Sequence, residues 1–227
     1  MAIDTPLTPG QGLLYGALGL PLAFVALPLY VVLPNHYATT FGMPLATLGL
    51  MLLGARLLDA FIDPLIGRWC DRLFARSPRQ VLVMGAFAAL ILAAGFGLLF
   101  FPATRQPQWL LVWAAVFLVV TYAAYSALSV AHQSWGAMLG GDDVQRSRIV
   151  AWREGLALVG VVLASMAPVL LGLPGTWVLF CACLLVGWLA WSRAVQPTPR
   201  QQAQAHNVWR PLQLPQFRQL LGIFVLN

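Results

Sequence analysis

Long apolar blocks, rather than an amphipathic alternation, make up most of this chain. Six of them are about 20 residues long, the length at which an α-helix crosses about 30 Å of hydrocarbon. They cover approximately residues 13–33, 45–67, 81–101, 109–128 with an extension to 139, 149–171 and 176–191. A seventh apolar run begins at Leu220 and is cut off at Asn227. The pattern predicts an all-α integral membrane protein with six spans and the start of a seventh.

Composition supports the same interpretation. Of the 227 residues, 60% are hydrophobic and only 9% are charged, too few charges to cover the surface of a water-soluble domain of this size. The three cysteines form no disulfide framework, and neither Cys181 nor Cys183 has further metal-ligand residues beside it. We therefore predict no structural metal and no cofactor beyond a coupling ion.

The arginines between the spans predict the orientation in the membrane. They gather in the second-to-third loop, in the fourth-to-fifth loop and after the sixth span, whereas the alternate loops carry only Arg105. Because cytoplasmic loops are enriched in basic residues, we expect a cytoplasmic N-terminus in a bacterial-type inner (plasma) membrane. The net charge of +6 then reflects topology, and we expect no nucleic-acid partner.

The order of these segments indicates half of a larger repeat protein. We expect a six-helix bundle over residues 1–194 and a cytoplasmic linker, rich in Gln and Pro, over residues 195–217. Residues 218–227 would begin a seventh helix. The expected partners are membrane lipids, a small-molecule substrate, and a C-terminal six-helix half or a second copy. Alone as a monomer, the chain is not expected to transport.

The second span carries charges where the membrane disfavours them. Arg56, Asp59 and Asp63 are spaced i, i+3, i+7, so that they lie within about 60° of one another on one helical stripe. Each ionised group at mid-bilayer costs at least about 2.5–3.5 kcal/mol, so the stripe must face protein or a water-filled cavity. One arginine and two aspartates leave a negative charge, which suits a monovalent cation such as Na⁺ or a proton. The alternative is an ion-pair set that locks helices together.

Two further groups of polar residues stand near the spans. Arg153 and Glu154 follow each other in the fifth span and point about 100° apart, so they cannot serve one site equally. For Glu154 we expect an interfacial position with a loop arginine as partner, and for Arg153 a structural or a functional role is open. After the second span, the pattern G-x-x-x-D-R-x-x-x-R predicts a breakable cytoplasmic latch made of Gly67, Asp71, Arg72 and Arg76.

These residues resemble the major facilitator superfamily, and within it the glycoside–pentoside–hexuronide:cation symporters, the melibiose permease family. The family pattern R-x-x-D-x-x-x-D-P is met from Arg56 to Pro64, the fifth-helix arginine by Arg153, and the loop motif by Gly67, Asp71 and Arg72. The resemblance covers about residues 15–191. It implies the N-terminal half of the superfamily fold, a 3+3 inverted repeat.

The resemblance also implies roles for individual residues. Asp59 and Asp63 would bind the coupling cation, Na⁺ or H⁺, and Arg56 would tune their charge. The fourth-helix polar position of the family falls at Ser129, which would complete the cation site. Where the family places a sugar-binding aspartate on the first helix, this chain has Leu22. The residues at the cation positions thus match the family pattern better than the residue at the sugar position does.

His132, one turn beyond Ser129, has two interpretations. It is a replacement substrate ligand or proton carrier, or a hydrogen-bonded structural histidine, and we favour the second.

Three function classes were compared. A cation-coupled symporter of a small solute such as a sugar fits the charged stripe. A transporter of a lipid or amphiphile, or a non-transporting scaffold, fits the apolar first helix. An enzyme is disfavoured: the metal-binding carboxylates of a CDP-alcohol phosphotransferase are missing, since no Asp-Gly precedes Arg56 and the last aspartate position is Ala75.

Overall fold

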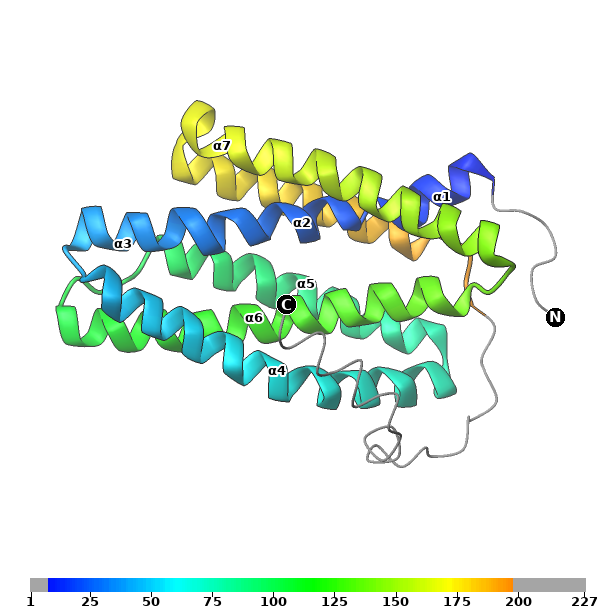
Figure 1. Cartoon of the computed structure of the whole chain (residues 1–227), viewed down its shortest axis with the longest axis horizontal. Coiled ribbons are helices and arrows are strands. Elements are labelled where there is room, and N and C mark those ends of the chain that lie inside the picture. Colours follow the sequence, from blue (N-terminus) through cyan, green and yellow to red (C-terminus); the bar gives the residue numbers. More distant parts are fainter. Residues whose placement is uncertain (1–7, 198–227) are drawn as a thin grey trace, which may run out of the picture.

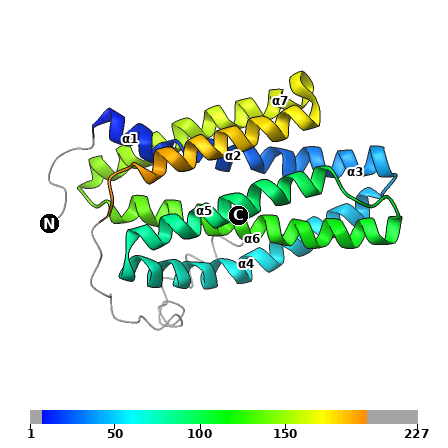
Figure 2. The same cartoon turned by 180° about the vertical axis from the view of Figure 1, so that it is seen from behind.

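The computed structural model describes residues 8–197, and in this range every regular element is a helix (Figures 1 and 2). The elements are α1 (Pro9–Gly16), α2 (Gly19–Leu27), the π-helix η1 (Pro28–Val32), α3 (Leu33–Phe41), α4 (Leu45–Arg76), α5 (Pro78–Phe100), α6 (Pro107–Met138) and α7 (Asp143–Ser192). The predicted all-helical membrane fold is confirmed. The predicted linker, apart from residues 195–197, and the predicted seventh helix lie outside the described residues.

The described part of the chain contains five helical segments long and apolar enough to cross a membrane. The first runs from Pro9 to Phe41, and the fifth, α7, unites the last two predicted spans. At Gly172 the backbone leaves the helical region with φ 68° and ψ 179°, a conformation that glycine adopts without a steric penalty. Pro168 and Pro174 flank this residue, and the two arms of α7 fold back side by side (Figures 1 and 2).

The first span is interrupted because its sequence contains three prolines. Pro21, Pro28 and Pro34 each lack the N–H that an uninterrupted helix would use. Around Pro28 the helix widens, and the N–H of Leu33 donates to the carbonyl of Pro28 five residues earlier. Such π-turns are rare and often occur at functional sites. Here the turn contains Tyr30, which reaches the charged residues of α4.

Glycines allow the first span to pack closely against α7. A Cβ at Gly16 would lie 2.7 Å from the carbonyl oxygen of Trp152, and one at Gly19 would lie 2.7 Å from that of Arg153. At Gly160 it would overlap the backbone of Leu20. Small residues at helix crossings are typical of membrane bundles, where close packing drives association. These contacts fix α2 against the first arm of α7.

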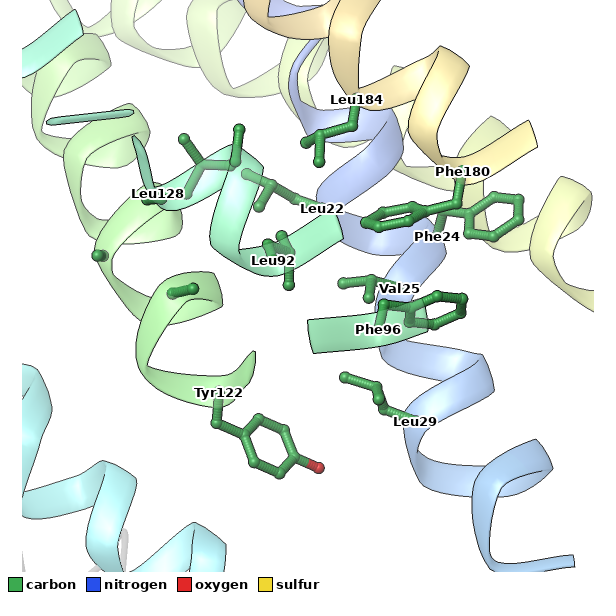
Figure 3. Close-up of a cluster of buried hydrophobic side chains, with 14 of the residues drawn as sticks. Leu22, Phe24, Val25, Leu29, Leu92, Phe96, Tyr122, Leu128, Phe180 and Leu184 are labelled. Carbon is green, nitrogen blue, oxygen red and sulfur yellow. The ribbon is translucent and has the colours of Figure 1, made fainter. Parts of the chain in front are cut away.

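The apolar core lies between α2, α5, α6 and the second arm of α7 (Figure 3). Phe180 stacks on Phe24 with ring centroids 5.8 Å apart and meets Phe96 in a tilted pair at 4.9 Å. α4 lies along one edge of the bundle and α7 along the opposite edge (Figures 1 and 2). In its most apolar stretch only 17% of the residues of α4 are buried, against 56% for α5. The helix with the charged stripe is therefore also one of the least covered.

Candidate functional site

Asp59 is the centre of the charged cluster on α4. It is 7% exposed, and its two carboxylate oxygens have different partners. Oδ1 accepts a hydrogen bond of 2.7 Å from the hydroxyl of Ser126 on α6. Oδ2 lies 3.7 Å from a guanidinium nitrogen of Arg56, one turn earlier on α4. The carboxylate thus joins α4 to α6 through Ser126, and its ion pair with Arg56 is longer than a direct hydrogen bond.

Two tyrosine rings hold the guanidinium of Arg56. Its central carbon lies 4.4 Å from the ring centroid of Tyr30 and 5.4 Å from that of Tyr122 on α6. The two rings are 5.9 Å apart, so together they form an aromatic clamp. A cation over an aromatic face is stabilised by about 0.5–2 kcal/mol, more where water is excluded. The clamp gives the guanidinium of Arg56 contacts in addition to its long pair with Asp59.

Asp63 differs from Asp59 in having no such partners. One of its carboxylate oxygens, Oδ1, is buried and has no hydrogen-bond partner among residues 8–197. The residue lies one helical turn beyond Asp59, a rise of about 6 Å. A buried carboxylate oxygen without a partner is costly, and in functional sites it commonly awaits a cation, a proton or water. Arg56, Asp59 and Asp63 are therefore brought together as predicted.

Ser129 does not reach this cluster through any hydrogen bond of the described residues. Its hydroxyl accepts a hydrogen bond of 2.9 Å from the side chain of Gln133. The hydroxyl that binds Asp59 belongs to Ser126, one turn earlier on α6. Sequence reasoning missed Ser126, Tyr30 and Tyr122 as site residues. The available signal was the i, i+4 spacing from Tyr122 to Ser126, which places both side chains on one face of a helix.

His132 lies in a separate, closed cluster. Its Nε2 lies 2.8 Å from the carbonyl oxygen of Tyr15, and the hydroxyl of Tyr15 donates to the carbonyl of His132 at 3.2 Å. The two rings stack with centroids 4.5 Å apart, and Trp191 meets the imidazole edge-on at 5.7 Å. The histidine is fully buried. This geometry matches the structural interpretation, although Nδ1 has no partner within the described chain.

Arg153 and Glu154 pair with each other. Two guanidinium nitrogens of Arg153 donate to one carboxylate oxygen of Glu154, at 2.6 and 3.0 Å. The expectation that Glu154 takes a loop arginine is therefore wrong, because the long side chain of Arg153 bends back over the 100° between neighbouring residues. No ion pair joins Arg153 to the α4 aspartates among the described residues.

The predicted latch lies on the last turns of α4. Gly67 faces open space, since a Cβ added there would meet nothing within 4 Å. Asp71, Arg72 and Arg76 are exposed and form no ion pair within residues 8–197. The structure thus places the motif where a partner could reach it and shows no closed latch.

A family model described as "MFS/sugar transport protein" matches residues 14–224. The chain belongs to this family. The chain is also similar to the inner membrane symporter YicJ of Escherichia coli strain K12, with which it is 29% identical over 136 residues. A second relative is the putative glycoside/cation symporter YagG of the same strain, 27% identical over 163 residues. A third is the uncharacterized symporter YnaJ of Bacillus subtilis strain 168, 30% identical over 137 residues.

The aligned regions cover 57, 71 and 59% of this chain, but 28, 35 and 29% of the three relatives, in the same order. The chain therefore spans about a third of the length of the curated relatives that it matches. Membership of the major facilitator superfamily and the resemblance to its glycoside:cation symporters are confirmed. The protein is a multi-pass membrane protein.

Proposed function

We propose that this chain forms one half of a cation-coupled secondary transporter, a symporter that moves a small solute such as a sugar or glycoside by alternating access. One observation carries the proposal: the buried, unpartnered oxygen of Asp63 lies one turn from Asp59 on the same stripe of α4. The relatives named as symporters support a transporter rather than an enzyme.

The charges of the cluster favour a single monovalent cation. Arg56 balances one of the two aspartates, and the second negative charge has no partner in the cluster. An uncompensated charge at this depth is expensive, so a Na⁺ ion or a proton bound between Asp59 and Asp63 would stabilise the arrangement. Ser126 already directs its hydroxyl to Asp59 and is placed to join the coordination. Arg56 would tune the affinity by competing for Asp59.

A second half, or a second copy, would complete the site. Three glycines of α4, Gly49, Gly54 and Gly67, face space in which an added Cβ meets nothing. At 100° per residue Gly49 and Gly67 lie on the same side of α4. Because glycines let transmembrane helices approach one another closely, this side is suited to a partner helix. The latch residues Asp71 and Arg72 would then find their partners across the same boundary.

The proposed orientation places the N-terminus and the α4–α5 turn in the cytoplasm of a bacterial inner membrane. The arginines at the end of α4 and the start of α5 support it. A single cysteine introduced at Arg76 should react with a membrane-impermeant thiol reagent only in inside-out vesicles. Reaction in right-side-out vesicles would contradict the orientation.

The coupling role is tested by Asp59→Asn in the complete transporter. We expect cation-driven accumulation to be abolished while downhill exchange of the substrate persists, because the ion drives transport only if its binding differs between the two states. Asp143→Asn, an exposed carboxylate at the start of α7 outside both the cluster and the latch, is the matched control and should keep cation dependence. Normal accumulation by Asp59→Asn with unchanged cation dependence would favour a purely structural ion-pair set.

A transporter of lipids or amphiphiles is the second candidate, and Leu22 favours it. This residue is 7% exposed and lies among Leu92 and Leu184 in the apolar core (Figure 3). It therefore offers no hydrogen bond to a sugar hydroxyl. Uptake by membrane vesicles of a panel of sugars against a panel of amphiphiles separates the two substrates. Cation-dependent uptake of neither would leave a non-transporting scaffold.

A further inference from the structure

A groove runs along the bundle surface between α4, α5 and α6, apart from the charged cluster. Its volume is about 830 Å³. On α4 it is lined by Ile62, Ile66, Trp69 and Leu73. At 100° per residue this stripe lies about 70° around the helix from the stripe of Asp59 and Asp63. The groove therefore belongs to a different face of α4 and is not part of the proposed cation site.

Small side chains of α6 make the groove deep. Its floor consists of Ala123, Ala124 and Ala127, with Val120 at one end. α5 contributes the opposite wall, where Val83 and Phe87 are 55 and 63% exposed. An apolar channel with exposed walls, in a helix bundle that spans a membrane, opens to hydrocarbon. Its walls can therefore be covered by a lipid chain.

One end of the groove is polar and positively charged. Arg79 and Gln80 line it at the first turn of α5, and Leu73 and Trp69 line the α4 side. Ser77 caps α5 by accepting from the N–H of Arg79, so this end coincides with the tight turn after α4. Arg72 and Arg76 are exposed on the last turns of α4 nearby. The acidic residue of these turns, Asp71, lies on the far side of α4, about 170° around the helix from the groove stripe.

The length of the groove matches one leaflet of a bilayer. From Arg79 to Ile91, its deepest residue on α5, the helix rises about 18 Å, and half of the hydrocarbon core is about 15 Å. Tryptophan and arginine at the membrane interface mark the depth of the lipid headgroups. An acyl chain lying in the groove would thus bring its phosphate to the level of Arg79.

We propose that this groove binds a glycerophospholipid with an anionic headgroup, one acyl chain lying on the alanine floor and the phosphate against Arg79. The apolar walls supply affinity for the chain, and the arginine end supplies the preference for negative charge. Each basic residue near an anionic lipid surface contributes enough for about a five-fold preference. The proposal is independent of the transported substrate and of the cation site.

The test is native mass spectrometry of the full chain in detergent with equimolar phosphatidylglycerol and phosphatidylcholine. We expect phosphatidylglycerol to be retained about five-fold more, and Arg79→Gln to abolish this preference. Arg105→Gln, an exposed arginine beyond the other end of α5, is the matched control and should keep it. Val83→Trp, which enlarges an exposed wall residue without disturbing the core, should reduce retention of both lipids. Ala123→Phe, which fills the floor, should do the same.

Helicity and gel-filtration profiles like those of the unaltered chain establish that each variant is folded. Equal retention of the two lipids, or equal losses in Arg79→Gln and Arg105→Gln, would overturn the proposal. Displacement of phosphatidylglycerol by glycerol phosphate, which lacks acyl chains, would reduce the groove to an anion site and would also overturn it. So would a disulfide between two copies carrying Val83→Cys at high yield, since a second chain would then occupy the groove.

Discussion

Two polar clusters lie inside this apolar bundle, and they are built differently. In the cluster of Tyr15 and His132 each residue bonds to the backbone of the other, and the rings stack at 4.5 Å. Both side chains are almost completely buried. In the cluster of Arg56, Asp59 and Asp63, the arginine side chain is 48% exposed and one oxygen of Asp63 has no partner in the described chain.

The difference is the one we expect between a structural polar contact and the proposed cation site. Tyr15 and His132 form a reciprocal pair that carries no formal charge when the imidazole is neutral, so it needs no counter-ion, although Nδ1 of His132 has no partner in the described chain. The α4 cluster carries an odd negative charge on a helix that is only 17% buried in its most apolar stretch. It is incomplete in charge and in packing, which is what a site for a mobile ion between two moving halves requires.

The largest expected effect is the loss of the closed cluster. His132→Ala should lower the free energy of unfolding by about 3 kcal/mol, since it removes a buried ring and leaves the carbonyl of Tyr15 unpaired. Asp63→Asn should change stability by less than about 0.5 kcal/mol without added cation, because it removes an uncompensated charge. Thermal unfolding in detergent measures both. A larger loss in Asp63→Asn than in His132→Ala would reverse the comparison.

The second effect is stabilisation by the coupling ion. A ligand at 100 times its Kd stabilises the folded state by about 2.7 kcal/mol, so a saturating cation should raise the unfolding midpoint. We expect Na⁺, compared with choline at equal ionic strength, to raise it in the unaltered chain and in His132→Ala. Asp59→Asn and Asp63→Asn should lose the shift. A coupling proton would instead give a midpoint that rises as pH falls, again only with both aspartates.

If neither Na⁺ nor pH moves the midpoint of the unaltered chain, the cluster does not bind the ion by itself. If Na⁺ raised the unfolding midpoint equally in the unaltered chain and in the three variants, the ion would bind elsewhere.

Much of the fold follows from the sequence because apolar length alone identifies membrane helices. The second span was predicted to start at Leu45, where α4 begins. The others lie within the observed helices, except that the predicted third span and the extension of the fourth each run one residue past the end of α5 and α6. The predicted ends were less accurate. The second span was predicted to end at residue 67, but α4 continues to Arg76 because a helix can extend past the hydrocarbon into polar residues. The π-turn at Pro28 could not be predicted, since three prolines predict interruption but not its form.

The candidate site was only partly predictable. The stripe of Arg56, Asp59 and Asp63 is visible in the sequence because all three residues share one helix, whose period fixes their directions. Ser126, Tyr30 and Tyr122 come from other helices, and their approach depends on how those helices rotate in the bundle. For this reason a serine was predicted one turn away from the observed one. The reciprocal bonds of His132 with Tyr15 likewise depend on packing across 117 residues of chain.

The third effect separates the two serines of α6. Ser126→Ala removes a hydroxyl that donates to a carboxylate at 2.7 Å, and bonds to charged groups contribute about 1.5–3 kcal/mol. We expect the apparent cation affinity to fall about ten-fold, a lower estimate because water can replace part of the bond. Ser129→Ala, which loses only its bond from Gln133, is the matched control. Titration of the unfolding midpoint with Na⁺ measures both affinities, and equal losses would contradict the assignment to Ser126.

The smallest expected effect comes from the aromatic clamp on Arg56. The pair with Asp59 is long, 3.7 Å, although a guanidinium and a carboxylate prefer about 2.7–2.9 Å. The guanidinium carbon lies 4.4 Å from the ring centroid of Tyr30, and we expect this contact to compete with closer pairing to Asp59. Tyr30→Leu should let Arg56 move onto Asp59, where it competes with the cation.

A contact of about 0.7 kcal/mol, near the exposed end of the cation–π range, corresponds to a three-fold loss of apparent cation affinity. Tyr30→Phe keeps the ring face and should leave the affinity unchanged. The same Na⁺ titration of the unfolding midpoint resolves a three-fold change when both variants are measured beside the unaltered chain. A tighter apparent affinity in Tyr30→Leu would mean that the ring presses Arg56 toward Asp59 instead of holding it back, and the clamp would then oppose cation binding.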